Sequence, residues 1–527
     1  MDNSETANPE VDTAPLSKSE CKEEQRPSAI QELGGLVSLA FPVVLQNIFG
    51  YMTSLVSAAF VGHLGSQVLS SVVMASSLYN VTGLSIVVGL ASGMETMCGQ
   101  AYGAQNYKML GLVMQRALLV CWGACIPITL FLSHSKPALL LMSLPPEVAD
   151  GASRYLLLMT PALFANALSS VLNRYLTSQR IMIPNTLCTV ASACLCPVYN
   201  WMFIHRLQLG LDGAAYANAL SQVTSTIILT TYVFWRDFGM IGSVKGTWPG
   251  LQFQLALESS AVYQYLSFGV PAAAMICLEW WAFEVLIILA GLIPGVAEIA
   301  LSSMGITFNI IATLYMFSAA LGTSANTRIA NALGAGLEKS AKTTFRVAIS
   351  TVFLLVSAFA VILWLCRSHL ALIFTNEEEV VNMVGLVIPI VCTTVVGDGA
   401  NAVFSGVLRG CGRQSLGAYS NLIGWWCVAV PLAVFLGLYE GLGIWGFWIA
   451  LCCGTNIQAL VFLVVISNLD WAKETQRAKA LVLSHSSPDL LAQLNGYSAQ
   501  EGHHRSASEQ EYLEEPLLKS TSDEGNV

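Results

Sequence analysis

The chain has 527 residues, of which 54% are hydrophobic and only 11% are charged. Soluble domains carry roughly 25% charged residues and about 45–50% apolar residues, so most of this chain cannot face water. The net charge of −9 gives no indication of a nucleic-acid partner. The composition therefore excludes an ordinary soluble enzyme and predicts an α-helical protein embedded in a membrane.

Apolar stretches of at least about 18 residues predict membrane-spanning helices, and they follow one another along this chain. In the first half they lie near 35–61, 67–97, 109–132, 150–176, 183–204 and 213–235. In the second half they lie near 264–292, 297–324, 342–366, 380–407, 416–438 and 443–467. We therefore expect an all-α membrane protein with twelve transmembrane helices.

The polar residues gather at the two ends of the chain and divide it into four segments. Residues 1–32 and 469–527 contain acids, bases, Ser, Pro and Gly without helical apolar periodicity, a composition typical of disordered tails. Between them, residues 33–240 hold the first six predicted helices and residues 241–468 hold the other six. We expect each set of six to form one lobe of a single membrane domain.

The second half of the chain repeats the first half at a nearly constant spacing. The matching pairs are Gly103-Ala104 with Gly334-Ala335, Asn166 with Asn401, Arg174 with Arg409, Gln179 with Gln414, and Leu209-Gly210 with Leu442-Gly443. Because six spans restore the same topology, the two lobes should be related by a pseudo-twofold axis along the membrane normal. A duplicated bundle of this kind commonly encloses a substrate cavity between its halves and rocks between two openings.

Lys and Arg near the helix ends predict the orientation of the chain. Twelve of them lie on one face of the predicted bundle and four on the other. Because cytosolic loops carry an excess of Lys and Arg, the face with twelve should be cytosolic, and so should both tails. The sequence does not distinguish the vacuolar membrane from the plasma membrane.

The C-terminal tail contains a stretch that looks like an acidic dileucine sorting signal. It consists of Glu514, Glu515, Leu517 and Leu518, and such signals are bound by adaptor complexes. Its spacing between acids and leucines is loose, so a solvated acidic tail is the alternative interpretation.

Two acidic residues are predicted to lie deep in the membrane. An ionisable side chain at the bilayer centre costs about 2.5–3.5 kcal/mol on insertion scales, so each is a functional candidate. Glu279 lies in the seventh span, eight residues after Pro271, and Asp398 lies in the tenth span between Gly397 and Gly399. We expect both carboxyl groups to bind coupling protons or cations; a buried pair that only fixes helix packing is the alternative.

Other polar and aromatic residues are weaker candidates. Glu284 lies nearer the end of the seventh span, and Glu95 lies near the cytosolic end of the second, where a salt bridge would explain it. Residues that could line a substrate cavity are Gln46, Asn47, Tyr79, Asn166, Trp280, Asn309 and Tyr315. Hydrogen bonds between helices explain the polar members of this set equally well, whereas Trp280 could stack on a flat or cationic ligand.

The motifs of soluble and metal-dependent enzymes are absent from the sequence. It contains no GxxxxGK[ST], HExxH or GxSxG motif and no His and Cys residues with metal-ligand spacing inside a predicted span. We therefore expect no catalytic residues, no metal site and no cofactor.

Six stretches, taken in order, resemble plant-type members of the multidrug and toxic compound extrusion (MATE) family. They are Pro42–Gly65, Gly93–Gln105, Arg174–Pro184, Cys277–Glu284, Arg328–Gly336 and Ser405–Gln414. The resemblance implies two six-helix lobes around a V-shaped cavity, and export of organic compounds driven by a gradient of H⁺ or Na⁺. Similar members have coupling acids in the second lobe, at positions that match Glu279 and Asp398. Many bacterial relatives instead have an Asp in the first span, where this chain has Gln46 and Asn47.

These observations lead to the hypothesis of a proton-coupled antiporter that exports organic cations or plant-type secondary metabolites. A Na⁺-coupled exporter and a flippase for lipid-linked precursors are alternatives with the same architecture. An integral membrane enzyme or a transporter-like receptor is an alternative from another class.

Overall fold

The computed structural model describes residues 28–141, 144–238, 246–293 and 297–483. All regular secondary structure in these ranges is helical. The N-lobe contains α1 (Ala29–Gly62), α2 (Ser66–Tyr79), α3 (Ser85–Ser92), α4 (Met94–Gly103), α5 (Tyr107–Ser133), α6 (Lys136–Leu141), α7 (Pro146–Ser178), α8 (Ile183–Asn200) and α9 (Gly210–Val233). The C-lobe contains α11 (Ser259–Ala290), α12 (Ala297–Gly334), α13 (Glu338–Cys366), α14 (Glu378–Gly410), α15 (Gln414–Asn421), α16 (Val430–Ala433) and α17 (Ile444–Ser467). The short α10 (Phe253–Ala256) lies between the lobes in the chain, and α18 (Trp471–Leu483) follows the C-lobe.

Several of these segments join into longer helices. A π-helical turn at Asn80–Leu84 connects α2 to α3, and α4 follows directly, so that Ser66–Gly103 is one span. Within the described residues, eleven helices are long and apolar enough to cross a membrane. The more polar α9 is not among them, but it packs against both α7 and α8 inside the N-lobe. With α9 included, the bundle has the predicted six long helices in each lobe.

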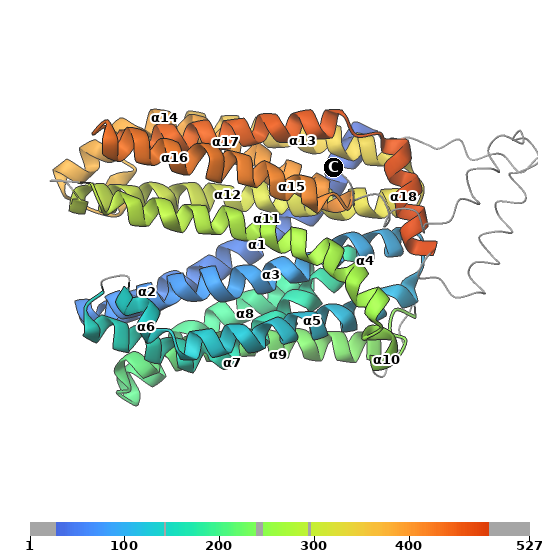
Figure 1. Ribbon diagram of the computed structural model, residues 1–527, viewed down its shortest axis with the longest axis horizontal. Helices are drawn as coiled ribbons and strands as arrows, with labels where there is room; N and C mark the ends of the chain where they lie inside the picture. The colour runs from blue at the N-terminus through green and yellow to red at the C-terminus, as the bar shows by residue number, and fades with distance from the viewer. Residues whose placement is uncertain (1–27, 142–143, 239–245, 294–296, 484–527) are drawn as a thin grey trace, which may run out of the picture.

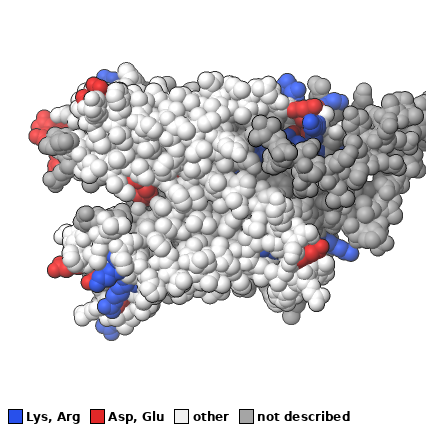
Figure 2. Space-filling view, viewed as in Figure 1, with Lys and Arg blue, Asp and Glu red and all other residues white. Residues whose placement is uncertain are grey.

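The two lobes form a V (Figure 1). They lie against each other at the end that carries α18, which we call the α18 end, and they diverge toward the opposite end, which we call the open end. The space-filling view shows a hollow between the lobes at the open end, with acidic side chains inside it (Figure 2). Each lobe has its own large cluster of buried apolar side chains. The lobes are therefore two separately packed bodies that share one seam.

The internal repeat predicted from the sequence is visible in the backbone and in the hydrogen bonds. Gly210 and Gly443 both have φ of +57°, a left-handed conformation that favours glycine, and they stand at the starts of α9 and α17. Asn401 donates to Gln458 at 3.1 Å, and Asn166 donates to Gln222 in the same way in the N-lobe. The repeat therefore extends from the turns to buried side chains.

Two boundaries predicted for the tails need correction. Helix α1 begins at Ala29, inside the predicted tail 1–32, because Ser28 and Gln31 form a capping box, with hydrogen bonds of 3.1 and 3.2 Å between them. Glu32 is fully buried and forms a bidentate ion pair with Arg328, with both N–O distances 2.6 Å. This end of the predicted tail is part of the membrane domain.

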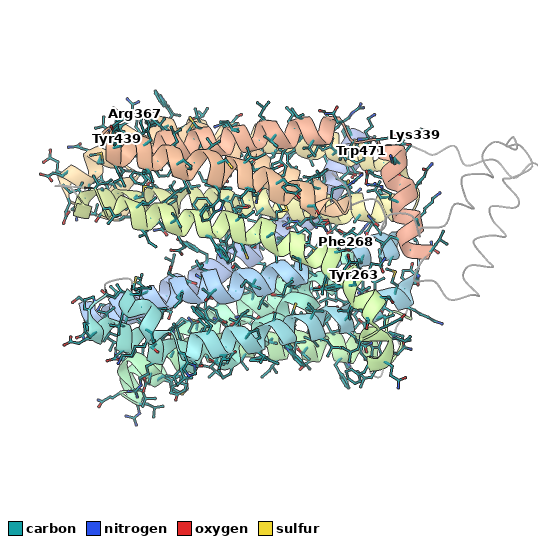
Figure 3. The ribbon with its side chains drawn as sticks, viewed as in Figure 1. Tyr263, Phe268, Lys339, Arg367, Tyr439 and Trp471 are labelled. Carbon is teal, nitrogen blue, oxygen red and sulfur yellow. The ribbon has the colours of Figure 1, made fainter. Side chains whose placement is uncertain are left out.

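The predicted C-terminal tail 469–527 is also interrupted by structure. Residues Trp471–Leu483 form α18, which runs across the ends of the long helices (Figure 1). Trp471 lies at the α18 end, opposite the end that carries Tyr439, and its ring packs 5.9 Å from that of Phe345 (Figure 3). Glu474 is 3% exposed and accepts a hydrogen bond of 2.6 Å from Arg413. The dileucine residues Glu514, Glu515, Leu517 and Leu518 lie outside the described residues.

Candidate transport site

The structure places Glu279 and Asp398 in the same lobe. Glu279 lies on α11 and Asp398 on α14, and α12 packs against both of these helices. Tyr315 on α12 donates a hydrogen bond of 3.4 Å to Glu279. Asp398 is 6% exposed, and no side chain in the described residues forms a hydrogen bond with it. The pair therefore combines a buried and a partly buried carboxyl group with few compensating partners.

The two glycines beside Asp398 allow α14 to pack tightly against its neighbours. A Cβ added at Gly399 would meet Val356 on α13 and come within 2.9 Å of the Ser318 hydroxyl on α12. A Cβ added at Gly397 would lie 3.1 Å from the Asn456 side chain on α17. The structure thus gives both glycines a packing role. They let Asp398 lie where three other helices converge.

No basic side chain in the described part of the chain forms an ion pair with Glu279 or Asp398. Arg409 forms its ion pair with Glu95 instead, at 3.4 Å. A pair of carboxyl groups without a fixed cation can exchange a proton or a bound cation.

Glu284 lies on the same helix as Glu279 but contacts the other lobe. It accepts a hydrogen bond of 2.8 Å from Ser77 on α2, so it bridges α11 and the N-lobe. The neighbouring Trp280 is partly exposed and forms no hydrogen bond within the described residues. Trp281 donates a hydrogen bond of 2.8 Å to the Val81 carbonyl, so a contact between the two lobes accounts for its position.

The first helix contributes polar groups to the C-lobe. Asn47 donates to the Met316 carbonyl at 3.2 Å, and Tyr51 donates to the side chain of Asn309. Gln46 is partly buried and has no hydrogen-bond partner in the described residues. Tyr51 was not among the residues expected from the sequence, although it follows Asn47 by four residues, about one helical turn, and so lies on the same side of the helix.

Uncharged polar residues form a chain of hydrogen bonds inside the N-lobe. Asn166 donates to Tyr79 at 3.0 Å and to Gln222, and Gln222 donates to Asn218 at 2.9 Å. Asn218 in turn donates to Tyr155 at 3.0 Å. The sequence analysis found Tyr79 and Asn166 but missed the two residues on α9, although Gln222 could have been found as the repeat partner of Gln458.

Glu95 lies away from the other candidates, at the seam near the α18 end. Its carboxylate pairs with Arg174 at 3.1 Å and with Arg409 at 3.4 Å, and it accepts a hydrogen bond from Asn326. The salt-bridge interpretation of Glu95 therefore matches its surroundings. Within the described residues there is also no group of three His, Cys, Asp or Glu side chains that could hold a metal ion.

Comparison with known proteins places this architecture in one family. The MatE family model matches residues 42–202 and 271–435, one match in each lobe. The chain is 33% identical to human multidrug and toxin extrusion protein 1 over 85% of this chain and 77% of that protein. It is 32% identical to Protein DETOXIFICATION 3 of Arabidopsis thaliana over 86% of this chain and 93% of that protein.

The crystal structure of the eukaryotic MATE transporter AtDTX14 superimposes with a TM-score of 0.80 at 31% sequence identity. The superposition covers 86% of this chain and 99% of that one. Sequence, repeat and fold thus agree, and the chain is a multi-pass integral membrane protein that belongs to the MATE family of efflux transporters.

Proposed function

We propose that this protein is a proton-coupled antiporter that exports small organic compounds, with organic cations as the first class to test. The observation that carries the proposal is the pair formed by the buried Asp398 and the partly buried Glu279, two carboxyl groups without an ion-pair partner in the described residues. The printed names of the human and Arabidopsis relatives, multidrug and toxin extrusion protein 1 and DETOXIFICATION 3, support export of foreign compounds.

The pair offers a physical reason for exchange. When both carboxyl groups lose their protons, two like charges repel each other in a medium that solvates them poorly. Either a proton or an organic cation near the pair relieves this repulsion. Binding of one therefore weakens the binding of the other. Protons that arrive from one side therefore favour release of the substrate, and proton loss on the other side favours its binding.

The charge distribution favours an orientation in which the α18 end is cytosolic. Positively charged residues lie there, including Lys339 (Figure 3) and Arg413, which pairs with Glu474 of α18, as expected for cytosolic ends of spans. The hollow in Figure 2 then opens away from the cytosol, to the cell exterior or the vacuolar lumen. Both chain ends belong to the cytosol in this arrangement.

Of the two closest alternatives, the flippase requires a cavity of the opposite charge, whereas the Na⁺-coupled exporter requires the same acidic side chains. A flippase for anionic lipid headgroups would need basic side chains in its cavity, whereas the deep charges of this chain are acidic. A Na⁺-coupled exporter would use the same carboxylates, so the driving ion has to be chosen by experiment.

The decisive experiment is uptake of a fluorescent organic cation into inside-out proteoliposomes under an imposed pH gradient. We expect accumulation by the wild type, and background levels for Asp398→Asn and Glu279→Gln. The matched control is Glu378→Gln, an exposed acid in the first turn of the helix that carries Asp398. Accumulation that follows a Na⁺ gradient instead, or that survives both substitutions, would contradict proton coupling at this pair.

A further inference from the structure

A buried ionic cluster lies on the seam between the lobes at the α18 end. One carboxylate, that of Glu95, pairs with Arg174 of its own lobe at 3.1 Å and with Arg409 of the other lobe at 3.4 Å. Asn326 of the C-lobe donates a hydrogen bond to the same carboxylate. The three charged side chains are between 14% and 17% exposed, so the cluster is shielded from water. Ion pairs in such surroundings are screened far less than pairs on the surface.

The members of this cluster are related by the internal repeat. Arg174 corresponds to Arg409, and the register that matches Gly103 with Gly334 also matches Glu95 with Asn326. The structure supports this register, because a Cβ added at Gly103 would meet the Asn331 carbonyl and one added at Gly334 would meet the Gln100 carbonyl. Two equivalent arginines therefore share one carboxylate near the pseudo-twofold axis, and an amide occupies the position equivalent to that carboxylate.

Around the cluster, the two lobes touch through their backbones. A Cβ added at Gly93 of α4 would lie 2.5 Å from the Cα of Gly269 on α11. The Thr96 hydroxyl donates to the Arg409 carbonyl at 2.5 Å, and the Gln100 amide donates to the Gly410 carbonyl at 3.2 Å. If the lobes part at this end, these bonds break together with the pair between Glu95 and Arg409. The pair between Glu95 and Arg174 lies within one lobe and can persist.

We propose that Glu95 is the positioning residue that holds the α18 end closed, and that its bond to Arg409 breaks in each transport cycle. The proposal rests on the transport function, because only a transporter has to open this end in alternation with the other. It deepens that function through α14, on which Arg409 follows Asp398 by eleven residues, about three helical turns. One helix thus carries a candidate coupling acid and the cation of the closed gate.

The chain contains its own reporter for this gate. Cys411 is a free, buried thiol in the turn between α14 and α15, and it lines a groove shared with Thr96 on α4 and Arg413. Cys98 is a free thiol that is fully buried in the N-lobe core, one turn away from the seam residues of α4. Opening of the α18 end should expose Cys411 and leave Cys98 protected.

The test measures the rate at which N-ethylmaleimide alkylates each cysteine, read peptide by peptide by mass spectrometry. Purified full-length protein is used in nanodiscs without substrate or pH gradient. The variant Glu95→Asn removes the shared carboxylate, and Glu95→Asn combined with Asn326→Glu moves it to the equivalent position across the axis. Asp150→Asn is the control, because Asp150 pairs with Lys136 at 2.5 Å within one lobe at the open end.

For Glu95→Asn we expect Cys411 to react at least about tenfold faster, which corresponds to about 1.4 kcal/mol in the opening equilibrium. The double variant should return the rate to within about twofold of the wild type, or about 0.4 kcal/mol by the same conversion. A residue with a merely structural role would not be rescued in this way, since the original contacts of position 95 stay lost. The control variant should react like the wild type, and Cys98 should stay protected throughout.

Three results would overturn the proposal. Unchanged alkylation of Cys411 in Glu95→Asn would show that the carboxylate does not hold the gate, and equal acceleration at Cys98 would indicate general loosening. Failure of the double variant to restore protection of Cys411 would show that a carboxylate at position 326 cannot replace the one at position 95. If Glu95→Asn cannot be purified, Arg409→Gln removes the cross-lobe ion pair and leaves the pair between Glu95 and Arg174, and an unchanged Cys411 rate there has the same meaning.

This test is separate from the test of proton coupling. Alkylation is measured without a gradient, so it does not depend on Glu279 or Asp398 as proton carriers. If proton-driven uptake fails while Glu95→Asn still exposes Cys411, the gate stands without the proposed coupling ion. If proton-driven uptake succeeds while Glu95→Asn leaves Cys411 protected, the gate is rejected and the proposed coupling stands.

Discussion

The N-lobe and the C-lobe share an architecture but differ in chemistry at equivalent depths. Asn166 and Asn401 occupy matching positions, and each donates to a glutamine on the last long helix of its lobe. Three residues before them, however, the N-lobe has Leu163, fully buried in apolar surroundings, where the C-lobe has Asp398. Duplication has supplied two similar frames, and a carboxyl group at this depth was kept or acquired in only one of them.

The strongest way to break this comparison is to exchange the residues at the two matching positions. Leu163→Asp buries an acid in a tightly packed core. The packing is tight because a Cβ added at the neighbouring Gly83 would lie only 3.3 Å from the Leu163 side chain. We expect a loss of about 3 kcal/mol or more in the free energy of unfolding, because the new charge has no partner. Asp398→Leu should keep or raise stability while it abolishes proton-driven uptake. Thermal unfolding followed by size-exclusion chromatography measures the stability of both variants, and the proteoliposome assay measures uptake. Equal losses of stability in the two variants would contradict the difference between the lobes.

A second difference concerns how closely the helices approach each other. In the C-lobe, a Cβ added at Gly406 on α14 would meet the Gly322 carbonyl on α12, whereas the matching N-lobe position is Val171. Gly406→Val should therefore destabilise the protein by about 1–3 kcal/mol through overpacking. Gly123→Val is the control, since nothing lies within 4 Å of an added Cβ there. A melting temperature equal to that of the control would show that α12 and α14 can separate at little cost.

The smallest expected effects come from the paired asparagines. Asn166→Ala and Asn401→Ala each remove two hydrogen bonds between helices, and such bonds contribute about 0.6 kcal/mol each on average. We expect similar small losses of stability from both. Only Asn401→Ala should shift the pH dependence of uptake, because it lies one turn from Asp398. A shift of equal size in Asn166→Ala would indicate that both lobes take part in coupling.

The sequence predicted two kinds of feature in this structure: those that follow from the internal repeat, and the acidic residues that lie within apolar spans. The long apolar runs, the matched Gly-Ala pairs, and the places of Glu279 and Asp398 inside long apolar helices required no knowledge of contacts. Their role in coupling stays a prediction, as does the role of Glu284. The hydrogen bonds of Asn47 and Tyr51 to α12 depend on how helices distant in sequence approach each other, which periodicity does not reveal.

Helix α18 escaped prediction for a different reason. Its buried face is short and mixes Trp471, Ala478 and Val482 with the acid Glu474, so its apolar signal is weak. Glu474 pairs with Arg413, 61 residues earlier, at 2.6 Å, and more loosely with Arg477 of its own helix at 3.6 Å. A polar sequence became ordered through a partner that the local pattern does not contain.

The same helix bears on how such a molecule could have evolved. An ancestor with a single lobe would have paired with an identical copy, and both sides of the resulting seam would have been equivalent. In this chain α18 contacts α4 of one lobe and α12 and α13 of the other, and the stretch after α9 leads instead into α10, which packs on α5. The two halves are therefore no longer interchangeable: pairing two copies of the first half would leave the seam uncovered, however well the long helices fitted together.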